Sequence, residues 1–200
     1  MLWKTRLIAP QWVALAAVFL GLAACSGTPG LVRPNEPVKV QRIFEVRSPI
    51  EWARFRGLGN ETWTIDGALL NRLTFITNIR DKEHIFGYGR QNRWNPDGAF
   101  YRTGMDPNEL RDLMVDGLAQ IGFANVSASN LQPGERDGFT TYQFDLDLRS
   151  PNGLTYKGHV LMLERRQRLN FVLFYAPVEY YYAKDADAVT AIFADLHVRP

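Results

Sequence analysis

The chain has 200 residues, a length typical of one domain with a short additional segment. It carries 23 Lys and Arg against 21 Asp and Glu, and this near balance argues against a dedicated nucleic-acid-binding protein. Hydrophobic residues make up 46% of the chain and charged residues 22%, which excludes general disorder. The single cysteine excludes an intrachain disulfide and a zinc site built on several cysteines.

The first 24 residues have the pattern of a bacterial export signal. Lys4 and Arg6 precede an apolar run that is uninterrupted over the 13 residues 12–24, too short to span a hydrocarbon core of about 30 Å as a helix. The run ends in Leu-Ala-Ala-Cys at residues 22–25, which resembles the lipobox of bacterial lipoproteins. The resemblance implies that the Cys25 thiol is diacylated and that cleavage makes it the first residue. An ordinary signal peptide with an incidental cysteine is the alternative.

The lipobox resemblance also predicts where the protein is held. Two or more acyl chains give stable membrane attachment, whereas one gives only marginal binding. Ser26 follows Cys25 in place of the Asp that retains similar lipoproteins in the inner membrane, so the resemblance implies an outer-membrane lipoprotein facing the periplasm. Removal of residues 1–24 takes away Lys4 and Arg6 and no acidic residue, leaving 21 basic and 21 acidic side chains. We therefore expect attachment through lipid rather than through net basic charge.

The mature chain is predicted to consist of a tether and one domain. Residues 25–42 are expected to form the acylated cysteine and a flexible tether, since three prolines and two glycines fall within residues 26–41. A structured arm that packs through Leu31 and Val32 is the alternative. Residues 43–198 are long enough to fold as a single globular domain without disulfides or metals.

Short strands and a long loop are predicted in the first part of the domain. Residues 43–46 and 62–65 have strand patterns. Asp-Gly at 66–67 is a hairpin-turn signal, so residues 68–79 are predicted to be the second strand of a hairpin, although their spacing also suits a helix. Residues 80–104 are rich in Gly, Asn, Arg and aromatic side chains, and we expect a long loop or a strand with an excursion.

A helix over residues 107–121 is the clearest element of the sequence. Asp106 and Glu109 form an Asp-x-x-Glu capping pattern, Pro107 suits the first turn, and Gly122 suits the position after the last turn. One apolar face is marked by Leu110, Leu113, Met114, Leu118 and Ile121.

A meander and a closing helix are predicted in the second part. Strands are expected at residues 123–129, 142–148, 154–164 and 169–176, separated by a loop at 130–138 and turns at 150–153 and 165–168. Gln143, Asp145 and Asp147 share the polar face of their strand, opposite an apolar face. An amphipathic helix capped by Asp185 is predicted over 185–196. The pattern indicates an α+β fold, an antiparallel sheet with two or more packed helices.

One stretch of this pattern resembles a known family. Residues 139–200 contain three strands, the segment Pro-x-Glu-Tyr-Tyr-Tyr-x-Lys-Asp, and a helix that ends in Phe-Ala-Asp-Leu-His-Val. Residues 44–52, Phe-x-Val-x-Ser-Pro-x-x-Trp, are compatible with an opening strand. The architecture is similar to that of Mog1/PsbP-like α/β/α sandwich domains, which occur in small bacterial lipoproteins. The resemblance extends over residues 43–198, includes no active-site motif, and implies a fold that hosts assembly factors and binding modules.

Two aromatic segments are the candidate recognition surface. Tyr, Trp and Arg are enriched at protein interfaces, and these types gather in the loop and after Pro177. The predicted binding surface consists of Arg90, Arg93, Trp94, Phe100, Tyr101, Tyr180, Tyr181 and Tyr182. The alternative is that the loop simply packs on the sheet.

Signals for catalysis are weak. The three histidines are scattered without metal-ligand spacing, and His159 is interpreted as a surface or hydrogen-bonded residue within a strand. Asp145 and Asp147 suit a cation site or an acid pair, but such residues more often form the solvated face of an antiparallel strand. Gly-x-Ser-x-Gly is absent from the sequence, and acylation of Cys25 would remove the one thiol nucleophile. We therefore expect no catalytic residue, no metal and no cofactor.

The sequence thus predicts a lipid-anchored, non-catalytic interaction or assembly module of the cell envelope. Its expected partners are the membrane, through the N-terminal lipid, and another envelope protein, with no nucleic acid. A small-ligand-binding lipoprotein, with the aromatic loop 86–104 over one end of the sheet, is the first alternative. An envelope hydrolase is the second, and a cleft that gathers Asp145, Asp147 and His159 would favour it.

Overall fold

The computed structural model describes residues 30–200, so the predicted signal peptide and Cys25 lie outside the described residues. The strands are β1 (Gly30–Val32), β2 (Val38–Val40), β3 (Phe44–Val46), β4 (Trp52–Arg56), β5 (Asn60–Thr64), β6 (Arg72–Ile79), β7 (Ala124–Arg136), β8 (Phe139–Arg149), β9 (Thr155–Arg165), β10 (Arg168–Pro177) and β11 (His197–Val198), and the helices are α2 (Pro107–Gln120) and α3 (Tyr181–Asp195). Within residues 30–200, no helix is both long and apolar enough to cross a membrane.

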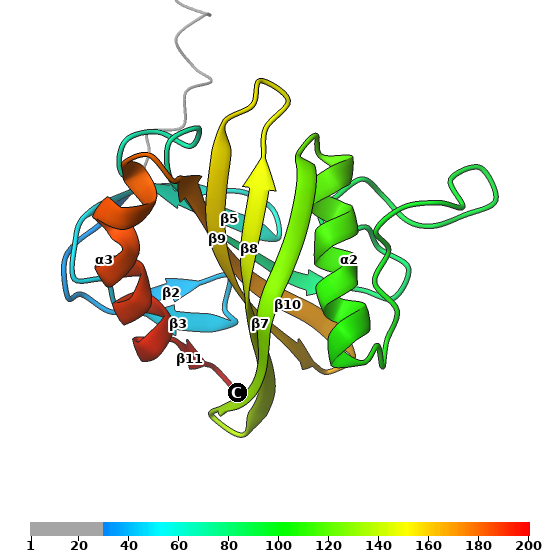
Figure 1. The fold of residues 1–200 in the computed structure, drawn as a ribbon. Helices are drawn as coiled ribbons and strands as arrows, with labels where there is room; N and C mark the ends of the chain where they lie inside the picture. Colours follow the sequence, from blue (N-terminus) through cyan, green and yellow to red (C-terminus); the bar gives the residue numbers. More distant parts are fainter. Residues whose placement is uncertain (1–29) are drawn as a thin grey trace, which may run out of the picture.

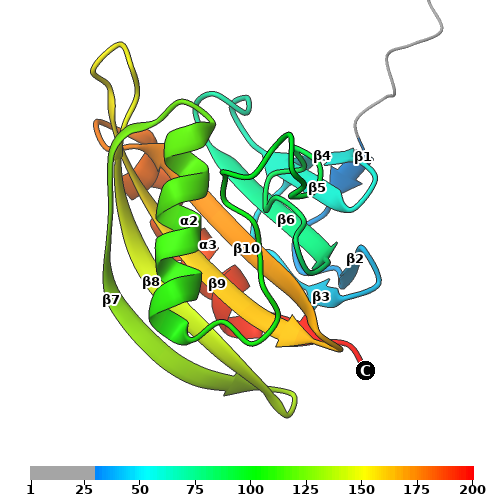
Figure 2. The ribbon, with the colours of Figure 1, turned by 90° about the vertical axis from the view of Figure 1, so that its right-hand side faces the viewer.

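A twisted antiparallel sheet forms the middle layer of the protein. Its eight strands follow the order β1-β4-β5-β6-β10-β9-β8-β7. Helix α2 covers one face, whereas α3 and the small sheet β11-β3-β2 cover the other (Figures 1 and 2). The predicted α+β class, an antiparallel sheet with two packed helices, is confirmed.

The central strand β10 shows why the sheet is covered on both sides. Nine of its ten residues are buried. Phe171 and Leu173 pack in the layer below α2, whereas Val172 and Phe174 pack in the layer below α3. A strand that is apolar on both faces is stable in water only where both faces are covered.

Helix α2 forms where its local signals place it. The Asp106 side chain accepts hydrogen bonds from the amides of Asn108 and Glu109, and the Glu109 side chain accepts one from the Asp106 amide, which completes the capping box. Gly122 follows the helix with a φ of 107°, a conformation that favours glycine. At Gly117, an added Cβ would lie 2.6 Å from Cδ1 of Ile85, so this glycine lets the loop before α2 pack closely on the helix.

The hairpin predicted around residues 66–67 forms with a wider connection than the sequence indicates. The second element is a strand, as predicted, but β6 begins at Arg72 rather than at residue 68. The side chain of Asn71, which is 1% exposed, accepts hydrogen bonds from the amides of Ile65 and Asp66. The hydrogen bonds of the Asn71 side chain therefore hold the two ends of this longer connection together, whereas a two-residue turn is held by backbone hydrogen bonds alone.

The loop predicted at residues 130–138 is wrong, because β7 continues to Arg136. Register shifts between Ala124 and Ser127, and between Ser129 and Gln132, let this long strand follow β8. Pro133 lacks an amide donor, and it is tolerated because β7 is an edge strand with one unpaired side.

The start predicted for the closing helix is also wrong. Helix α3 begins at Tyr181, four residues before Asp185. Asp185 is 1% exposed inside the helix, where its carboxylate accepts a hydrogen bond from the side chain of Asn71 at 2.8 Å. The aromatic run is part of the helix because Tyr182 packs against Phe174 of the sheet, with 5.9 Å between ring centroids.

The flexible tether predicted over residues 25–42 is wrong for residues 30–42. Strand β1 adds to the sheet edge beside β4, and β2 pairs with β3. Val32 and Val40 are fully buried, which gives the segment an apolar anchor in the core. The alternative, a structured arm, therefore holds for this part through Val32, whereas Leu31 is 54% exposed, and residues 25–29 lie outside the described range.

Candidate binding cleft

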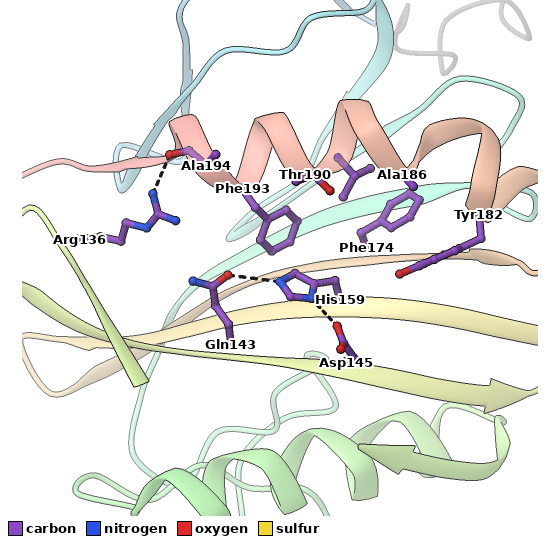
Figure 3. Close-up of a pocket in the computed structure, with 11 residues that line it drawn as sticks. Arg136, Gln143, Asp145, His159, Phe174, Tyr182, Ala186, Thr190, Phe193 and Ala194 are labelled. Carbon is purple, nitrogen blue, oxygen red and sulfur yellow. Dashed lines mark hydrogen bonds and ion pairs between the residues drawn. The ribbon is translucent and has the colours of Figure 1, made fainter. Parts of the chain in front are cut away.

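A cleft of about 390 Å³ lies between α3 and the strands β8, β9 and β10 (Figure 3). We call it the α3 cleft. It is lined by Arg136, Gln143, Asp145, His159, Phe174, Tyr182, Ala186, Val189, Thr190, Phe193 and Ala194.

The register of three strands builds the floor of the cleft. Asp145 on β8 lies directly opposite His159 on β9, which lies opposite Phe174 on β10. Phe144 and Leu146 point to the α2 side and are buried there, so their odd-numbered neighbours face α3. Gln143 and Asp145 of the polar strand face predicted from the sequence therefore lie in the floor of a cleft, whereas Asp147 of the same face is exposed outside it.

Asp145 and His159 form a hydrogen-bonded pair in this floor. Nδ1 of His159 lies 2.8 Å from Oδ1 of Asp145, and Nε2 lies 3.3 Å from Oε1 of Gln143 (Figure 3). An imidazolium ring would donate at both nitrogens, and a neutral ring protonated at Nδ1 would accept from the Gln143 amide once that amide is turned over. In both protonation states of His159, Nδ1 donates a hydrogen bond to the Asp145 carboxylate.

A bulge in β7 completes the surroundings of Asp145. Asn130 has a φ of 57° and lies between the two residues where the register shifts, and its amide nitrogen donates to Oδ2 of Asp145 at 2.7 Å. Burial alone would raise the pKa of Asp145, but the hydrogen bonds from Asn130 and His159 and the charges of His159 and Lys157 outweigh it and lower that pKa. Asp145 is therefore a carboxylate at neutral pH.

The opposite wall of the cleft is largely apolar and comes from α3. The ring of Phe193 meets His159 edge-on, with centroids 4.8 Å apart. Val189 lies one helical turn earlier on the same helix face. Burial, together with the negative charges of Asp145 and Asp147, raises the pKa of Tyr182, so its phenol stays neutral and can donate.

Arg136 closes the end of the cleft beside the C-terminus of α3. Its guanidinium donates to the carbonyl of Ala194 at 2.7 Å, where a cation also meets the negative end of the helix dipole (Figure 3). The cleft thus combines an acceptor-rich floor, a cation at one end and an aromatic wall. This combination suits a ligand with hydrogen-bond donors or a positive charge on an apolar body.

Only two of the three residues that would favour a hydrolase lie together in the cleft. Asp145 and His159 are paired, but Asp147 does not line the cleft. Among the lining residues, only Tyr182 and Thr190 carry a hydroxyl group, and the hydrogen-bond partners of His159 are Asp145 and Gln143. A nucleophile held by the histidine, the arrangement of acyl-transfer enzymes, is therefore not found at this cleft within the described residues.

The predicted loop surface divides between the core and solvent. Trp94 is 81% exposed, and the Arg93 guanidinium lies 4.2 Å from the centroid of its ring. Arg90 is also exposed and donates to the carbonyl of Asp81. Phe100 and Tyr101 are buried, so the prediction that they belong to an exposed surface is wrong. Tyr101 packs in the layer between the loop, α2 and the sheet and donates to Glu164, whereas Phe100 packs edge-on against His84, with 5.6 Å between ring centroids.

The tyrosine run at residues 180–182 does not lie beside the loop between β6 and α2, which carries Trp94 and which we call the tryptophan loop. Tyr180 is 61% exposed at the start of α3, while Tyr181 and Tyr182 are half-buried against the α3 side of the core. The loop between β6 and α2 lies on the opposite side of the sheet (Figure 1). The eight predicted residues therefore form two separate groups, because the sheet lies between them.

Sequence reasoning missed most of the cleft. Arg136, Phe174 and Thr190 carry no sequence signal of a site, and Gln143 and Phe193 were predicted only as members of a strand face and of a helix. The available signal was the alternation of polar residues along β8, combined with the one histidine of β9. Strand order and register were needed to place these two polar sites side by side.

Comparisons with known proteins show the fold alone. No protein-family model and no curated protein matches the chain. The solution structure of cyanobacterial PsbP (CyanoP) from Synechocystis sp. PCC 6803 is similar, with a TM-score of 0.54 and 12% identity, covering 89% of this chain and 99% of that protein. This likeness defines the class, a PsbP-like α+β fold, and supports the resemblance expected from the sequence.

Two further solved structures match at lower similarity. A Bacteroides thetaiotaomicron protein has a TM-score of 0.44 and 11% identity, covering 86% of this chain and 49% of that one. A Pseudomonas aeruginosa protein of unknown function has a TM-score of 0.43 and 10% identity, covering 74% of this chain and 98% of that one.

Proposed function

We propose that this chain is a lipid-anchored lipoprotein of the cell envelope whose domain is a non-catalytic binding module. The α3 cleft carries the proposal, because an Asp145–His159 pair lies under an aromatic wall in a cavity of about 390 Å³. Such a mixture of apolar lining and a few placed polar groups is typical of ligand sites. The ligand is a small molecule, or a side chain of another envelope protein, that offers a cation or hydrogen-bond donors.

The proposed architecture is a Mog1/PsbP-like α/β/α sandwich held at a membrane by acylated Cys25. The likeness to CyanoP supports this architecture, and it leaves function to be argued from the cleft. The lipobox supports acylation with palmitate-type chains, and Ser26 supports an outer-membrane address on the periplasmic side.

Changing Cys25 to serine is expected to abolish acylation. The serine hydroxyl does not form the thioether, so acylation should be lost and unprocessed precursor should accumulate. Labelling cells with radioactive palmitate, followed by mass spectrometry of the purified chain, measures both effects. Cys25→Ala gives the matched control, and palmitate that still enters either variant would contradict the anchor.

Crosslinking from inside the cleft is expected to capture the ligand. A photoreactive amino acid placed at Thr190, which lines the cleft, should give a defined adduct in cells, whereas the same group at the exposed Asp187 should not. Asp145→Asn keeps the shape and removes the charge, and we expect it to reduce that adduct about tenfold if the bound group is cationic. Equal adducts at the two helix positions, or no effect of Asp145→Asn, would contradict recognition at the cleft.

Docking of a protein on the tryptophan loop is a second candidate function. The exposed Trp94 ring with Arg93 stacked on it is the observation that favours it, since both types are frequent in binding hot spots. The same photoreactive group placed at Trp94 separates the two candidates. A protein adduct at Trp94 without one at Thr190 would move recognition from the cleft to the loop.

A further inference from the structure

Exposed apolar side chains gather at the edge of the sheet where the described chain begins. Of the eight large hydrophobic residues exposed among residues 30–200, three belong to β1, β4 and the β4–β5 turn. Leu58 at the tip of that turn is fully exposed, and Leu31 and Phe55 are 54% and 46% exposed. Scattered exposed leucines are common, so their position relative to one another decides whether they form a surface.

Leu31 and Phe55 lie on one side of the sheet edge, and Leu58 lies at the tip of the adjoining β4–β5 turn. Leu31 lies opposite Ala53 in the β1–β4 register, so Leu31 and Phe55 are diagonal neighbours on the same face. This is the face that α2 covers further along the sheet, but α2 packs against β7 and does not cover the β1–β4 edge (Figure 2). We call Leu31, Phe55 and Leu58 the apolar edge.

A basic groove lies on the other side of the same turn. The open groove, of about 940 Å³, includes the side chains of Lys39, Arg42, Arg56 and Arg199. The carboxylate of Glu61, which also lies there, is paired with Arg54 and does not offset these four cations. The surface therefore combines a local excess of positive charge with the apolar edge, although the mature chain has balanced charges overall.

The turn that carries Leu58 is held in place by side-chain hydrogen bonds. The Gln41 amide donates to the carbonyls of Gly57 and Asn60, at 3.0 and 2.8 Å, and so links the β2–β3 turn to the β4–β5 turn. Leu58 is therefore held at the tip of a braced turn, and Arg42 of the neighbouring turn lines the basic groove together with Arg56.

The distance to Cys25 places this surface within reach of a bilayer. Gly30 follows Cys25 by five residues, which span at most about 17 Å. Gly30 pairs with Arg54, and the tip of the turn at Leu58 lies four residues further along that hairpin, about 13 Å away. An acyl-bearing residue at the membrane surface thus keeps the apolar edge and the basic groove close to the lipid headgroups.

We propose that this edge docks on the phospholipid bilayer that holds the lipid anchor. Leu58 and its apolar neighbours enter the interface between headgroups and acyl chains, while Arg42 and Arg56 contact anionic headgroups. The inference rests on the proposed lipid anchor. Strand β7 is at the opposite edge of the sheet, so docking holds the β8–β9 floor of the α3 cleft away from the membrane and open to the periplasm.

Depth measurements on the acylated protein test this orientation. Because Cys25 is consumed by acylation, a cysteine introduced as Leu58→Cys can be labelled with a nitroxide or fluorophore. Leu69→Cys is the matched control, because Leu69 is an exposed leucine, 83% accessible, in the next hairpin connection. The protein is reconstituted in phosphatidylethanolamine vesicles with phosphatidylglycerol, and quenching by brominated lipids and accessibility to oxygen are compared.

The expected result is lipid contact for the label at position 58 and water contact for the label at position 69. Adding Arg42→Gln or Arg56→Gln should lower the ratio of docked to undocked protein about fivefold for each arginine removed. A chain whose mass shows acylation but whose label at position 58 stays in water would overturn this inference and leave the anchor intact. A chain without acyl mass would overturn both.

Discussion

Replacing Glu61 with alanine is expected to lower the free energy of unfolding by about 3–5 kcal/mol, because it leaves a buried arginine without its counter-ion. The Arg54 and Glu61 side chains are 9% and 1% exposed. Their paired atoms include Nη2 of Arg54 and Oε2 of Glu61 at 2.9 Å, and Arg54 also donates to the carbonyl of Lys39. Trp63 donates its indole N–H to the same carboxylate at 2.7 Å, so removal of Glu61 leaves this donor unsatisfied too.

Urea unfolding followed by circular dichroism measures this loss. Glu36→Ala is the matched control, because Glu36 pairs with Arg33 at 3.7 Å between side chains that are 59% and 68% exposed, and such pairs contribute at most about 1 kcal/mol. A double variant, Arg54→Met with Glu61→Leu, should regain most of the stability because no charge remains buried. A Glu61→Ala variant as stable as Glu36→Ala would contradict the importance of the pair.

Replacing Asn71 with leucine is expected to lower the free energy of unfolding by roughly 2–4 kcal/mol at pH 7, since several buried groups lose partners together. Its carbonyl oxygen accepts from the amides of Ile65 and Asp66. Its amide nitrogen donates to the carboxylates of Asp66 and Asp185, each at 2.8 Å. One side chain thus joins the β5–β6 connection to helix α3, and its loss should loosen the helix that forms the wall of the cleft.

The same variant should show a characteristic dependence on pH. Burial raises the pKa of Asp185, opposed by the hydrogen bond from Asn71 and the charge of Lys184, while Asp66 adds to the increase. A carboxyl whose pKa is raised by folding favours the folded state below its unfolded pKa, and this contribution is lost as pH rises through the folded pKa. Removing Asn71 raises the folded pKa further, so the loss should be larger at pH 7 than at pH 4.

Unfolding at the two pH values, in the variant and in the parent chain, checks this expectation. Asp185→Asn serves as the control, because it removes the charge, and in that background the effect of Asn71→Leu should no longer depend on pH. A loss below about 1 kcal/mol, or an equal loss at both pH values, would contradict the role assigned to Asn71.

Local chemistry was sufficient to find the elements whose signals are contiguous in the chain. The α2 caps, its apolar period and Gly122 all lie within seventeen residues, and their physical effect needs no distant partner. Alternation along β8 likewise predicted which of its residues face the core, since the two faces of a strand are set by backbone geometry.

The incorrect predictions share a dependence on distant partners. Asp185 matches the pattern of an N-cap, but Asn71, separated by 114 residues, and the packing of Tyr182 decide that the helix starts earlier. Residues 30–42 are rich in proline, yet pairing of β1 with β4 and of β2 with β3 orders them. Tyr101 is a core residue because it packs with α2 and the sheet, and Phe100 is buried against His84.

The sequence by itself determined the α+β class, the capped helix, the meander and the lipobox that predicts an anchor at Cys25. Each of these follows from residues within one local window, where propensity, capping and periodicity act. Only the tertiary structure decided that Asp145 and His159 meet under Phe193, and that Leu31, Phe55 and Leu58 share one edge. Such sites depend on strand order and register, which arise from the packing of the whole domain.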